Sequence, residues 1–222
     1  MQTPGPQLPL PLAYRSAHGR EDFVVGASNS MAVAWVDRWP DWPAPLLIVS
    51  GPAGSGKSHL ADVWRSRTGA PVIAAGALTS EAAPALLRRG ALVIEDLETL
   101  TDETALFHML NFAREMTAHL LLTLSTSPSA LALRTPDLGS RLRAAPHAAI
   151  GEPDPALLAQ LIARHFDARG IHASADMIDF LANRIERSAE AAREWVARIY
   201  DHALRHNRRL NMRLLREVMA GV

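Results

Sequence analysis

The chain has 222 residues, of which 48% are hydrophobic and 21% are charged, so it is long enough for one globular domain or for a domain with a lid. Its 23 basic and 23 acidic residues cancel, which disfavours a protein that binds nucleic acid over its whole surface. Without cysteine the chain can form neither disulfides nor cysteine-ligated metal sites. It also lacks an apolar run long enough to span a membrane and a basic leader before its first leucines. We therefore expect a cytoplasmic protein with no membrane partner.

The first 20 residues contain four prolines and show little hydrophobic periodicity. Proline-rich segments without an apolar face have no reason to fold on their own. We therefore predict a flexible tail over residues 1–20.

From Phe23 onward, short β-rich runs alternate with helical stretches. This alternation predicts an α/β fold in which a parallel sheet is covered by helices on both faces. We assign residues 21–153 to this unit, the base. The expected strands lie at 45–50, 71–77, 91–97, 119–125 and 147–153, and the expected helices near 57–66, 80–89 and 102–116.

After Pro155 no strand pattern returns, and apolar residues recur at helical spacing. Residues 154–222 are therefore predicted to form a helical lid, with Ser174 as a plausible N-cap of its second helix. The four expected helices lie within 155–170, 175–187, 189–206 and 210–219.

The segment "GPAGSGKS", Gly51 to Ser58, matches the phosphate-loop pattern G-x-x-x-x-G-K-S between a predicted strand and a predicted helix. Its glycines let backbone N–H groups point at phosphate oxygens, and the next helix offers its positive N-terminus. Lys57 is the only lysine in the chain, and its compact ammonium can reach the β- and γ-phosphates, which a wider arginine head imitates poorly. The alternative is a chance glycine loop. We expect ADP or ATP to contact Gly51, Pro52, Ala53, Gly54, Ser55, Gly56, Lys57, Ser58 and His59, with Ser58 as a Mg²⁺ ligand.

The segment "ALVIED", Ala91 to Asp96, reads as an apolar strand that ends in two acids. In the usual arrangement of such strands an aspartate supports Mg²⁺ and a following glutamate orients water. Here Glu95 takes the metal-supporting place and Asp96 the catalytic one, so one side chain is a methylene longer and the other a methylene shorter. A solvated strand end is the alternative interpretation.

Two further polar positions follow in the chain. The strand "LLLTLSTSP" ends in Ser125 and Thr126, whose hydroxyls could touch the γ-phosphate or the attacking water, although a hydroxyl turn explains them about as well. Arg141, in "TPDLGSRLRAA", is expected to follow a turn, and taken alone it would be a solvated arginine.

In this order the parts resemble an AAA+ ATPase, and more closely the DnaA replication initiators. The matching segments are "DFVVGASN" at 22–29, "PDLGSRL" at 136–142 and "RSAEAAREWVARI" at 187–199. The resemblance runs from about residue 7 to residue 222, with no counterpart of the helix-turn-helix DNA-binding domain of DnaA. It implies an arginine finger at Arg141 and a nucleotide-sensing lid arginine at Arg193. The residues that it places beside the adenine are Phe23, Val24 and Val25.

The tail segment "QLPLPL", Gln7 to Leu12, resembles the motif by which proteins dock on the bacterial sliding clamp. Two prolines hold it extended, which reduces the ordering cost of binding, and its partner-binding side chains would be Gln7, Leu8, Leu10 and Leu12. A tail packed on its own domain is the alternative. Together with the DnaA-like ATPase pattern, this motif is similar to the Hda family, the regulatory inactivators of DnaA.

This resemblance implies that the chain docks on the clamp, meets ATP-bound DnaA and stimulates its ATP hydrolysis through Arg141 in trans, touching DNA only through the clamp. Because Glu95, Asp96 and Ser125 depart from stronger hydrolytic arrangements, we expect a weak intrinsic ATPase.

Other interpretations stay open. A self-contained AAA+ remodeller of the helicase-loader type would need robust turnover, and a small P-loop kinase is disfavoured by the long helical tail. The tryptophans of "WVDRWPDWP" could stack on bases, although packing of a helix and a turn against the core explains them better. The basic stretch at 205–217 reads as the turn before the last lid helix rather than as a phosphate contact, and homo-oligomers are not excluded.

Overall fold

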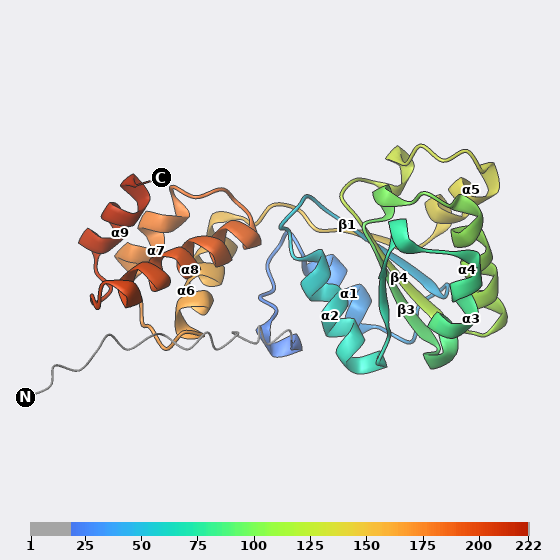
Figure 1. Cartoon of the computed structure of the whole chain (residues 1–222), viewed down its shortest axis with the longest axis horizontal. Coiled ribbons are helices and arrows are strands. Elements are labelled where there is room, and N and C mark those ends of the chain that lie inside the picture. The colour runs from blue at the N-terminus through green and yellow to red at the C-terminus, as the bar shows by residue number, and fades with distance from the viewer. Residues whose placement is uncertain (1–18, 222) are drawn as a thin grey trace, which may run out of the picture.

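A computed structural model describes residues 19–221 of the chain. Within this part, an α/β base and a helical lid lie next to each other along the long axis of the molecule (Figure 1). The expected clamp motif, Gln7 to Leu12, lies outside the described residues.

The base is built on a parallel sheet with the strand order β2-β3-β4-β1-β5, in agreement with the predicted fold class. β1 pairs with β4 along its whole length, from Leu46 opposite Leu120 to Ser50 opposite Leu124. After β1 the chain crosses to the far edge of the sheet, so the loop after β1 opens at a topological switch point, where α/β sheets bind their ligands. The strands are β1 (Leu46–Ser50), β2 (Val72–Ala74), β3 (Ala91–Glu95), β4 (His119–Leu124) and β5 (His147–Ala149).

Helices cover both faces of the sheet, because alternate strand residues point to opposite sides. Leu46 and Ile48 of β1 join the core beneath α4 (Glu103–Glu115) and α5 (Pro136–Ala144). Leu47 and Val49 join the core beneath α1 (Ser30–Asp37) and α2 (Lys57–Thr68). All five residues of β1 are buried, which explains its continuous apolar pattern.

The predicted strands run too far at their C-terminal ends. The stretch at 71–77 leaves the sheet after Ala74 and forms a short 3-10 helix (Ala75–Ala77), and the stretch at 147–153 leaves it after Ala149. β3 and β4 likewise end at Glu95 and Leu124. Just beyond β2, β3 and β5, the buried residues Ala75, Leu97 and Ile150 still pack into the core, and periodicity alone cannot distinguish such residues from a strand.

The helix predicted at 80–89 is also wrong. Only α3 (Ala83–Leu86) is α-helical there, between the 3-10 turns Ser80–Ala82 and Leu87–Arg89. Leu87 is fully buried, but no other residue described in this stretch is, so few apolar contacts support a longer helix.

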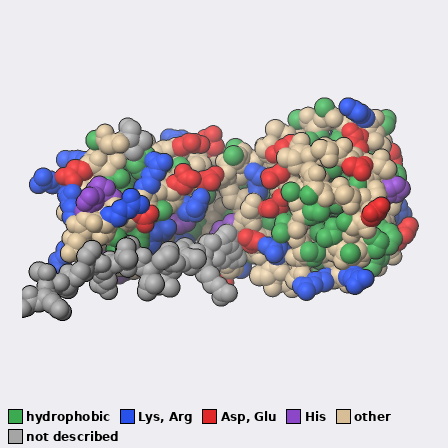
Figure 2. All heavy atoms as spheres, viewed as in Figure 1, with side chains coloured by type: hydrophobic (Ala, Val, Ile, Leu, Met, Phe, Trp, Pro, Cys, Tyr) green, Lys and Arg blue, Asp and Glu red, His purple; other side chains and the backbone are tan. Residues whose placement is uncertain are grey.

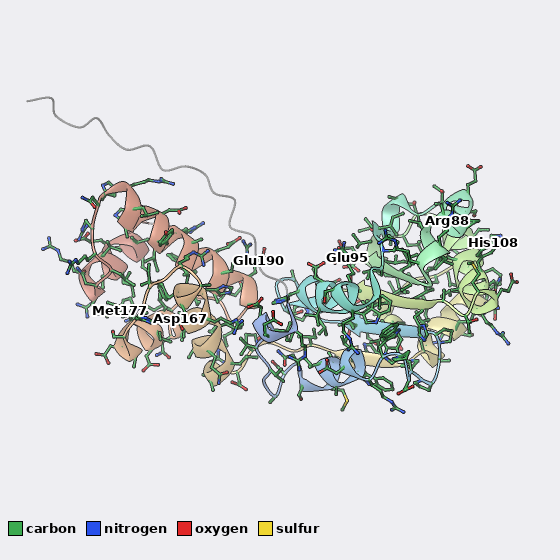
Figure 3. All side chains as sticks on the ribbon, turned by 90° about the horizontal axis from the view of Figure 1, so that it is seen from below. Arg88, Glu95, His108, Asp167, Met177 and Glu190 are labelled. Carbon is green, nitrogen blue, oxygen red and sulfur yellow. The ribbon has the colours of Figure 1, made fainter. Side chains whose placement is uncertain are left out.

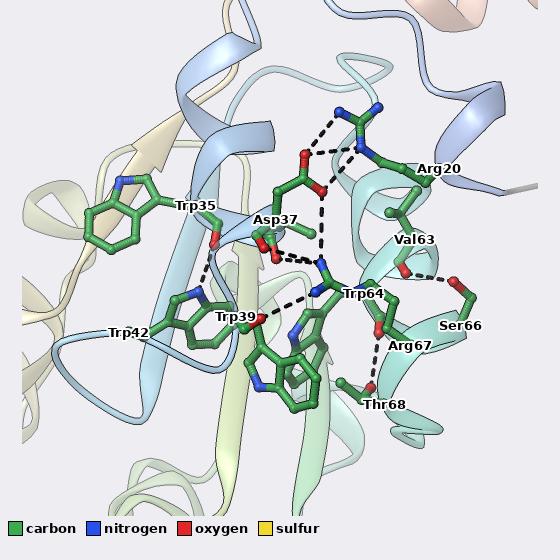
Figure 4. Close-up of polar contacts among 11 residues, drawn as sticks. Arg20, Trp35, Asp37, Trp39, Trp42, Val63, Trp64, Ser66, Arg67 and Thr68 are labelled. Carbon is green, nitrogen blue, oxygen red and sulfur yellow. Dashed lines mark hydrogen bonds and ion pairs between the residues drawn. The ribbon is translucent and has the colours of Figure 1, made fainter.

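Four tryptophans pack the turn after α1 against the sheet (Figure 4), namely Trp35, Trp39, Trp42 and Trp64. Trp42, which is 8% exposed, stacks on the ring of Trp64 at a centroid distance of 5.5 Å, and Trp39 meets Trp64 edge-on at 6.2 Å. The indole N–H of Trp42 donates to the carbonyl oxygen of Trp35 at 2.7 Å. The packing interpretation is therefore confirmed for Trp42, whose ring face is used inside the core.

The lid has a hydrophobic core of its own. Buried side chains such as Phe166, Val196 and Leu214 meet there, and no base residue takes part in this cluster within the described chain. The predicted helix at 175–187 ends early, at Ala182, and Ile185 reaches the core from the turn that follows. The lid helices are α6 (Pro155–Asp167), α7 (Ala175–Ala182), α8 (Ala189–Arg205) and α9 (Met212–Ala220).

Charged side chains of both signs are interspersed over the visible faces of the base and the lid, in keeping with the zero net charge (Figure 2). None of the helices placed between residues 19 and 221 combines the length and the hydrophobicity that a bilayer span requires.

Candidate nucleotide-binding site

The loop between β1 and α2 has the backbone of a phosphate cradle. Gly54 and Gly56 take φ angles of 69° and 102°, in the left-handed region that side chains with a Cβ avoid. These turns lead directly into α2, which begins at Lys57 and runs for 12 residues. The positive end of a full-length helix therefore adjoins the loop, as anion binding requires.

Lys57 is folded back onto this loop. Its ammonium donates to the carbonyl oxygens of Gly51 at 2.7 Å and Pro52 at 2.9 Å. Burial lowers the pKa of Lys57, and the carboxylates of Glu98 and Asp96 offset part of that effect. An incoming phosphate would replace neutral carbonyl oxygens with charged ones, so the ammonium gains on binding.

A cavity of about 1120 Å³ opens between the loop and the lid. It is large enough for a nucleoside triphosphate, since small-molecule sites commonly measure about 300–1000 Å³. It is lined by the loop from Ala53 to His59, by the segment from Asp22 to Val24, and by residues of α6 and α8. The predicted residues Gly51, Pro52 and Val25 do not line it, and Val25 is exposed.

Polar and aromatic groups on the cavity wall suit such a ligand. The hydroxyl oxygens of Ser28 and Ser55 are buried and have no hydrogen-bond partner within residues 19–221, and both residues line the cavity. Phe23 and His59 meet edge-to-face with their ring centroids 5.0 Å apart, which gives the wall an aromatic section. Buried polar atoms without partners are expected where a polar ligand supplies the missing bond.

The two acids at the end of β3 differ in backbone conformation and in position relative to the cavity. The strand ends at Glu95, and Asp96 takes a left-handed φ of 55° while its N–H donates to the buried hydroxyl of Thr123 at 3.2 Å. Asp96 lines the cavity, whereas Glu95, the predicted metal-supporting residue, does not. Asp96 is therefore at the cavity, where the sequence analysis expects it, and only Glu95 is not.

Glu98 is an acid of this region that the sequence analysis missed. The backbone N–H of Ser125 donates to both of its carboxylate oxygens, at 3.1 and 3.3 Å. Burial by itself would raise the pKa of Glu98, but the hydrogen bonds from Ser125 and the charge of Lys57 hold it below its usual range. The only signal in the sequence is an acid one turn beyond the strand, and Ser125 contributes here by its hydrogen bonds to this carboxylate. Its hydroxyl does not line the cavity.

The lid supplies positive charge to the opposite wall. Arg193 on α8 lines the cavity and pairs with Glu190 at 3.5 Å and with Glu194 at 3.8 Å. On α6, Arg164 pairs with Asp22 of the base, and His165 is partly buried beside these arginines. In Figure 3, Glu190 lies at the edge of the lid nearest the base, and Arg88 and His108 lie at the far end of the base.

Arg141 lies far from this cavity. It does not follow a turn, as the sequence analysis expected, but sits inside α5, at the end of the base remote from the lid (Figure 1). Its guanidinium bonds to Asn111 at 2.5 Å, pairs with Asp137 at 3.0 Å and lies 4.6 Å from the ring centroid of Phe107. These contacts orient the group on the outside of α4.

Comparison with known proteins identifies structures that share this fold. No protein-family model matches the chain, and no curated protein matches its sequence. Domain III of the replication initiation protein DnaA from Thermotoga maritima matches with a TM-score of 0.75 at 17% identity, over 92% of this chain and 96% of that one. The RuvB Holliday junction branch migration motor of the same organism matches with a TM-score of 0.64 at 19% identity, over 78% and 60%. AMPPCP-bound DnaA from Aquifex aeolicus matches with a TM-score of 0.69 at 19% identity, over 85% and 66%.

The chain has the AAA+ fold.

Within this AAA+ base, the groups that can hold a magnesium nucleotide are the loop amides, Lys57 and the hydroxyl of Ser58, which lines the cavity at the start of α2. No cluster of three or more histidine or carboxylate groups that could bind a metal occurs among residues 19–221. Mg²⁺ commonly binds through one or two protein oxygens plus the substrate phosphates, so it fits here together with a nucleotide. Asp96 is a candidate for a second protein oxygen, because it lines the same cavity.

Proposed function

We propose that this AAA+ protein is a nucleotide-controlled negative regulator of replication initiation, of the kind that inactivates DnaA. In this proposal it binds ADP or ATP with Mg²⁺, docks on the DNA-loaded sliding clamp through Gln7 to Leu12, and stimulates hydrolysis of DnaA-bound ATP. The likeness of the fold to that of AMPPCP-bound DnaA supports nucleotide binding.

The placement of Arg141 carries the proposal. The side chain is 36% exposed, and it is oriented by Asn111, Asp137 and the ring of Phe107 rather than by its own cavity. An arginine has five N–H donors, and the contacts to Asn111 and Asp137 leave others facing solvent. An oriented, partly exposed guanidinium away from the chain's own phosphates is suited to a phosphate bound by a neighbouring molecule.

The chain's own site supports binding better than turnover. Glu95 lies outside the cavity, Asp96 is held in a turn by Thr123, and Arg193 is paired with two acids of its own helix. Hydrolysis needs a carboxylate that orients water and cations that stabilise the transferred phosphoryl group. We therefore keep the role of regulator ahead of that of a self-contained ATPase.

Nucleotide binding is tested first with Lys57→Ala. This change removes the only cation of the loop, so calorimetry should detect no tight binding of ADP. An unchanged affinity would remove the phosphate-loop assignment and, with it, the nucleotide-controlled part of the proposal.

The in-trans role is tested with Arg141→Ala, with Arg143→Ala as the matched control. Arg143 belongs to the same helix, and its guanidinium donates to the hydroxyl of Ser140 at 3.4 Å. Arg141→Ala should lose the stimulation of DnaA hydrolysis on clamp-loaded DNA, by about 10³-fold if it acts as an arginine finger, and keep its own ADP affinity. Normal stimulation by this variant would refute the role. Robust ATP turnover by the wild type without DnaA would favour the helicase-loader alternative.

Clamp docking is tested with the triple change Gln7→Ala, Leu10→Ala and Leu12→Ala. Binding to the clamp should be lost with little change in melting temperature, because the leucines fill a pocket of another protein. If the tail were packed on its own domain, each buried leucine would instead cost about 2–5 kcal/mol of stability.

A further inference from the structure

The N-terminus of α8 rests directly on the phosphate loop. The backbone N–H of Glu190 donates to the carbonyl oxygen of Gly54 at 3.2 Å. A Cβ placed on Gly54 would lie 2.8 Å from Cβ of Glu190 and 3.2 Å from its Oε2. The lid therefore places a carboxylate over the middle of the loop, and Gly54 leaves the room for it.

The two carboxylate oxygens of Glu190 face different groups. Oε1 is 3.5 Å from the guanidinium of Arg193, whereas Oε2 lies on the Gly54 side. Both Glu190 and Arg193 line the cavity, so the lid arginine that faces the phosphate site is already paired with an acid there.

The terminal phosphate of a triphosphate and the carboxylate of Glu190 compete for the space over the loop and for the guanidinium of Arg193. The backbone of a phosphate loop and its lysine hold the β- and γ-phosphates, and the terminal phosphate carries the most concentrated negative charge. A carboxylate over the loop repels that charge, and it also occupies the arginine that would neutralise it. A diphosphate, which lacks the terminal group, meets less of this repulsion.

We propose that Glu190 sets the nucleotide preference of this cavity, disfavouring triphosphates relative to diphosphates until Arg193 exchanges its carboxylate partner for the terminal phosphate. The inference rests on the proposed nucleotide binding and deepens it. It makes the lid a gate whose closed position is stabilised by Glu190 and whose triphosphate-bound position requires Arg193 to change partner.

Glu194 provides a matched control on the same helix. It lies 3.8 Å from Arg193 and is 53% exposed, against 51% for Glu190. Unlike Glu190, it does not line the cavity. Neutralising Glu194 therefore removes an equivalent charge next to Arg193 without changing what lies over the loop.

The experiment measures the affinities of AMPPCP and ADP, each with Mg²⁺, for the wild type, Glu190→Gln and Glu194→Gln by calorimetry. Glu190→Gln should bind AMPPCP about fivefold more tightly, the effect of one unit charge at about 4 Å in water, and should bind ADP with a gain of about twofold at most. Glu194→Gln should change neither affinity by more than about twofold. The gain should shrink at high salt, because exposed charges are screened.

Two variants separate charge from structure. Glu190→Gln removes a negative charge from the first turn of α8, so it should lower the melting temperature slightly, opposite in direction to the affinity gain. In an Arg193→Ala background the same change should give a smaller gain, because no arginine is left to exchange. An equal gain in both backgrounds would overturn the exchange.

The outcomes also separate this inference from the proposed function. If Glu190→Gln binds both nucleotides with an unchanged ratio of AMPPCP affinity to ADP affinity, the gate is overturned and nucleotide binding stands. The same holds if Glu194→Gln shifts this ratio as much as Glu190→Gln does. Failure of both the wild type and Glu190→Gln to bind either nucleotide would overturn both. Binding of AMPPCP only after the substitution would support the gate in its strongest form.

Discussion

His165 lies on α6 among cations rather than among acids. Burial lowers its pKa to about 4, and the nearby charges of Arg169, Arg193, His59 and Arg164 act in the same direction. The imidazole is therefore neutral at pH 7, and the cavity wall keeps its positive charge on the arginines. Protonation of His165 would add a further cation where several already crowd.

This pKa shift predicts a loss of stability in mild acid. The unfolded chain takes up the proton near pH 6.5 and the folded chain only near pH 4, so the free energy of unfolding falls as the pH is lowered between these values. The slope for one group is at most about 1.4 kcal/mol per pH unit. Urea unfolding at pH 7, 6 and 5 should show this slope in the wild type and a smaller one in His165→Gln.

Equal slopes in the wild type and in His165→Gln would show that His165 does not titrate differently in the folded protein.

The sequence predicts the backbone conformation of residues within one short motif. It does not predict the contacts that residues after the end of β3 make with β4. The left-handed angles of Gly54 and Gly56 and the position of Lys57 follow from the phosphate-loop pattern. The contacts of Asp96 with Thr123 and of Glu98 with Ser125 cross from β3 to β4, each over 27 residues, and depend on how β3 ends. The strand pattern could not give that end, because apolar spacing continues past it.

At the scale of the element, the caps of the lid helices differ in a way that can be measured. Asp154 caps α6, since its side chain accepts the N–H of Leu157 at 2.8 Å. Ser174 occupies the same position before α7, but its side chain makes no cap hydrogen bond. The expected N-cap is therefore present at Ser174 by position and not by bonding.

Substitutions at these two caps test whether an N-cap residue stabilises its helix through the cap hydrogen bond. Asp154→Ala should lower the free energy of unfolding by about 1 kcal/mol, because it leaves an N–H of the first turn unpaired. Ser174→Ala should change it by much less. Chemical denaturation of both variants makes the comparison, and an equal loss would show that Ser174 forms its cap bond in solution.

Element types were more predictable than element ends. The sequence pattern around Arg141 indicates a turn followed by an arginine, but Pro136 begins a nine-residue helix and Arg141 lies within it. A proline is well suited to the first turn of a helix, so the signal was present. What the pattern did not carry is the partner surface on α4, where Asn111 and Phe107 orient the guanidinium.

At the scale of the whole molecule, the base and the lid have separate hydrophobic cores joined by a small set of contacts. Gly26 of the base lies against Leu157 of α6, since a Cβ on Gly26 would be 2.8 Å from a methyl carbon of that leucine. Asp22 pairs with Arg164, and the loop carbonyl of Gly54 receives the N–H of Glu190. The angle between base and lid therefore depends on few interactions.

Breaking the ion pair between Asp22 and Arg164 should change the angle between base and lid while lowering the free energy of unfolding only slightly. Asp22→Asn should lower the free energy of unfolding by no more than about 1 kcal/mol, because the pair is partly exposed, and should widen the average distance between base and lid. Fluorescence energy transfer between labels on α4 and α9 measures that distance. The charge-reversed pair, Asp22→Arg with Arg164→Asp, should restore it, and an unchanged distance in Asp22→Asn would show that the pair does not hold the lid.

Features that depend on neighbouring residues can be derived from the sequence: the alternation of strands and helices, the phosphate loop with its single lysine, and the helical character of the lid. Hydrophobic spacing and backbone steric limits act over a few residues, so they can be recognised locally. The groups that meet across the cavity, in contrast, are known from the folded structure and not from any local pattern. Asp22 and Arg164 are 142 residues apart, and Glu190 reaches Gly54 only because α8 turns its N-terminus toward the loop. Such contacts follow from how two cores pack against each other, and no local pattern encodes that arrangement.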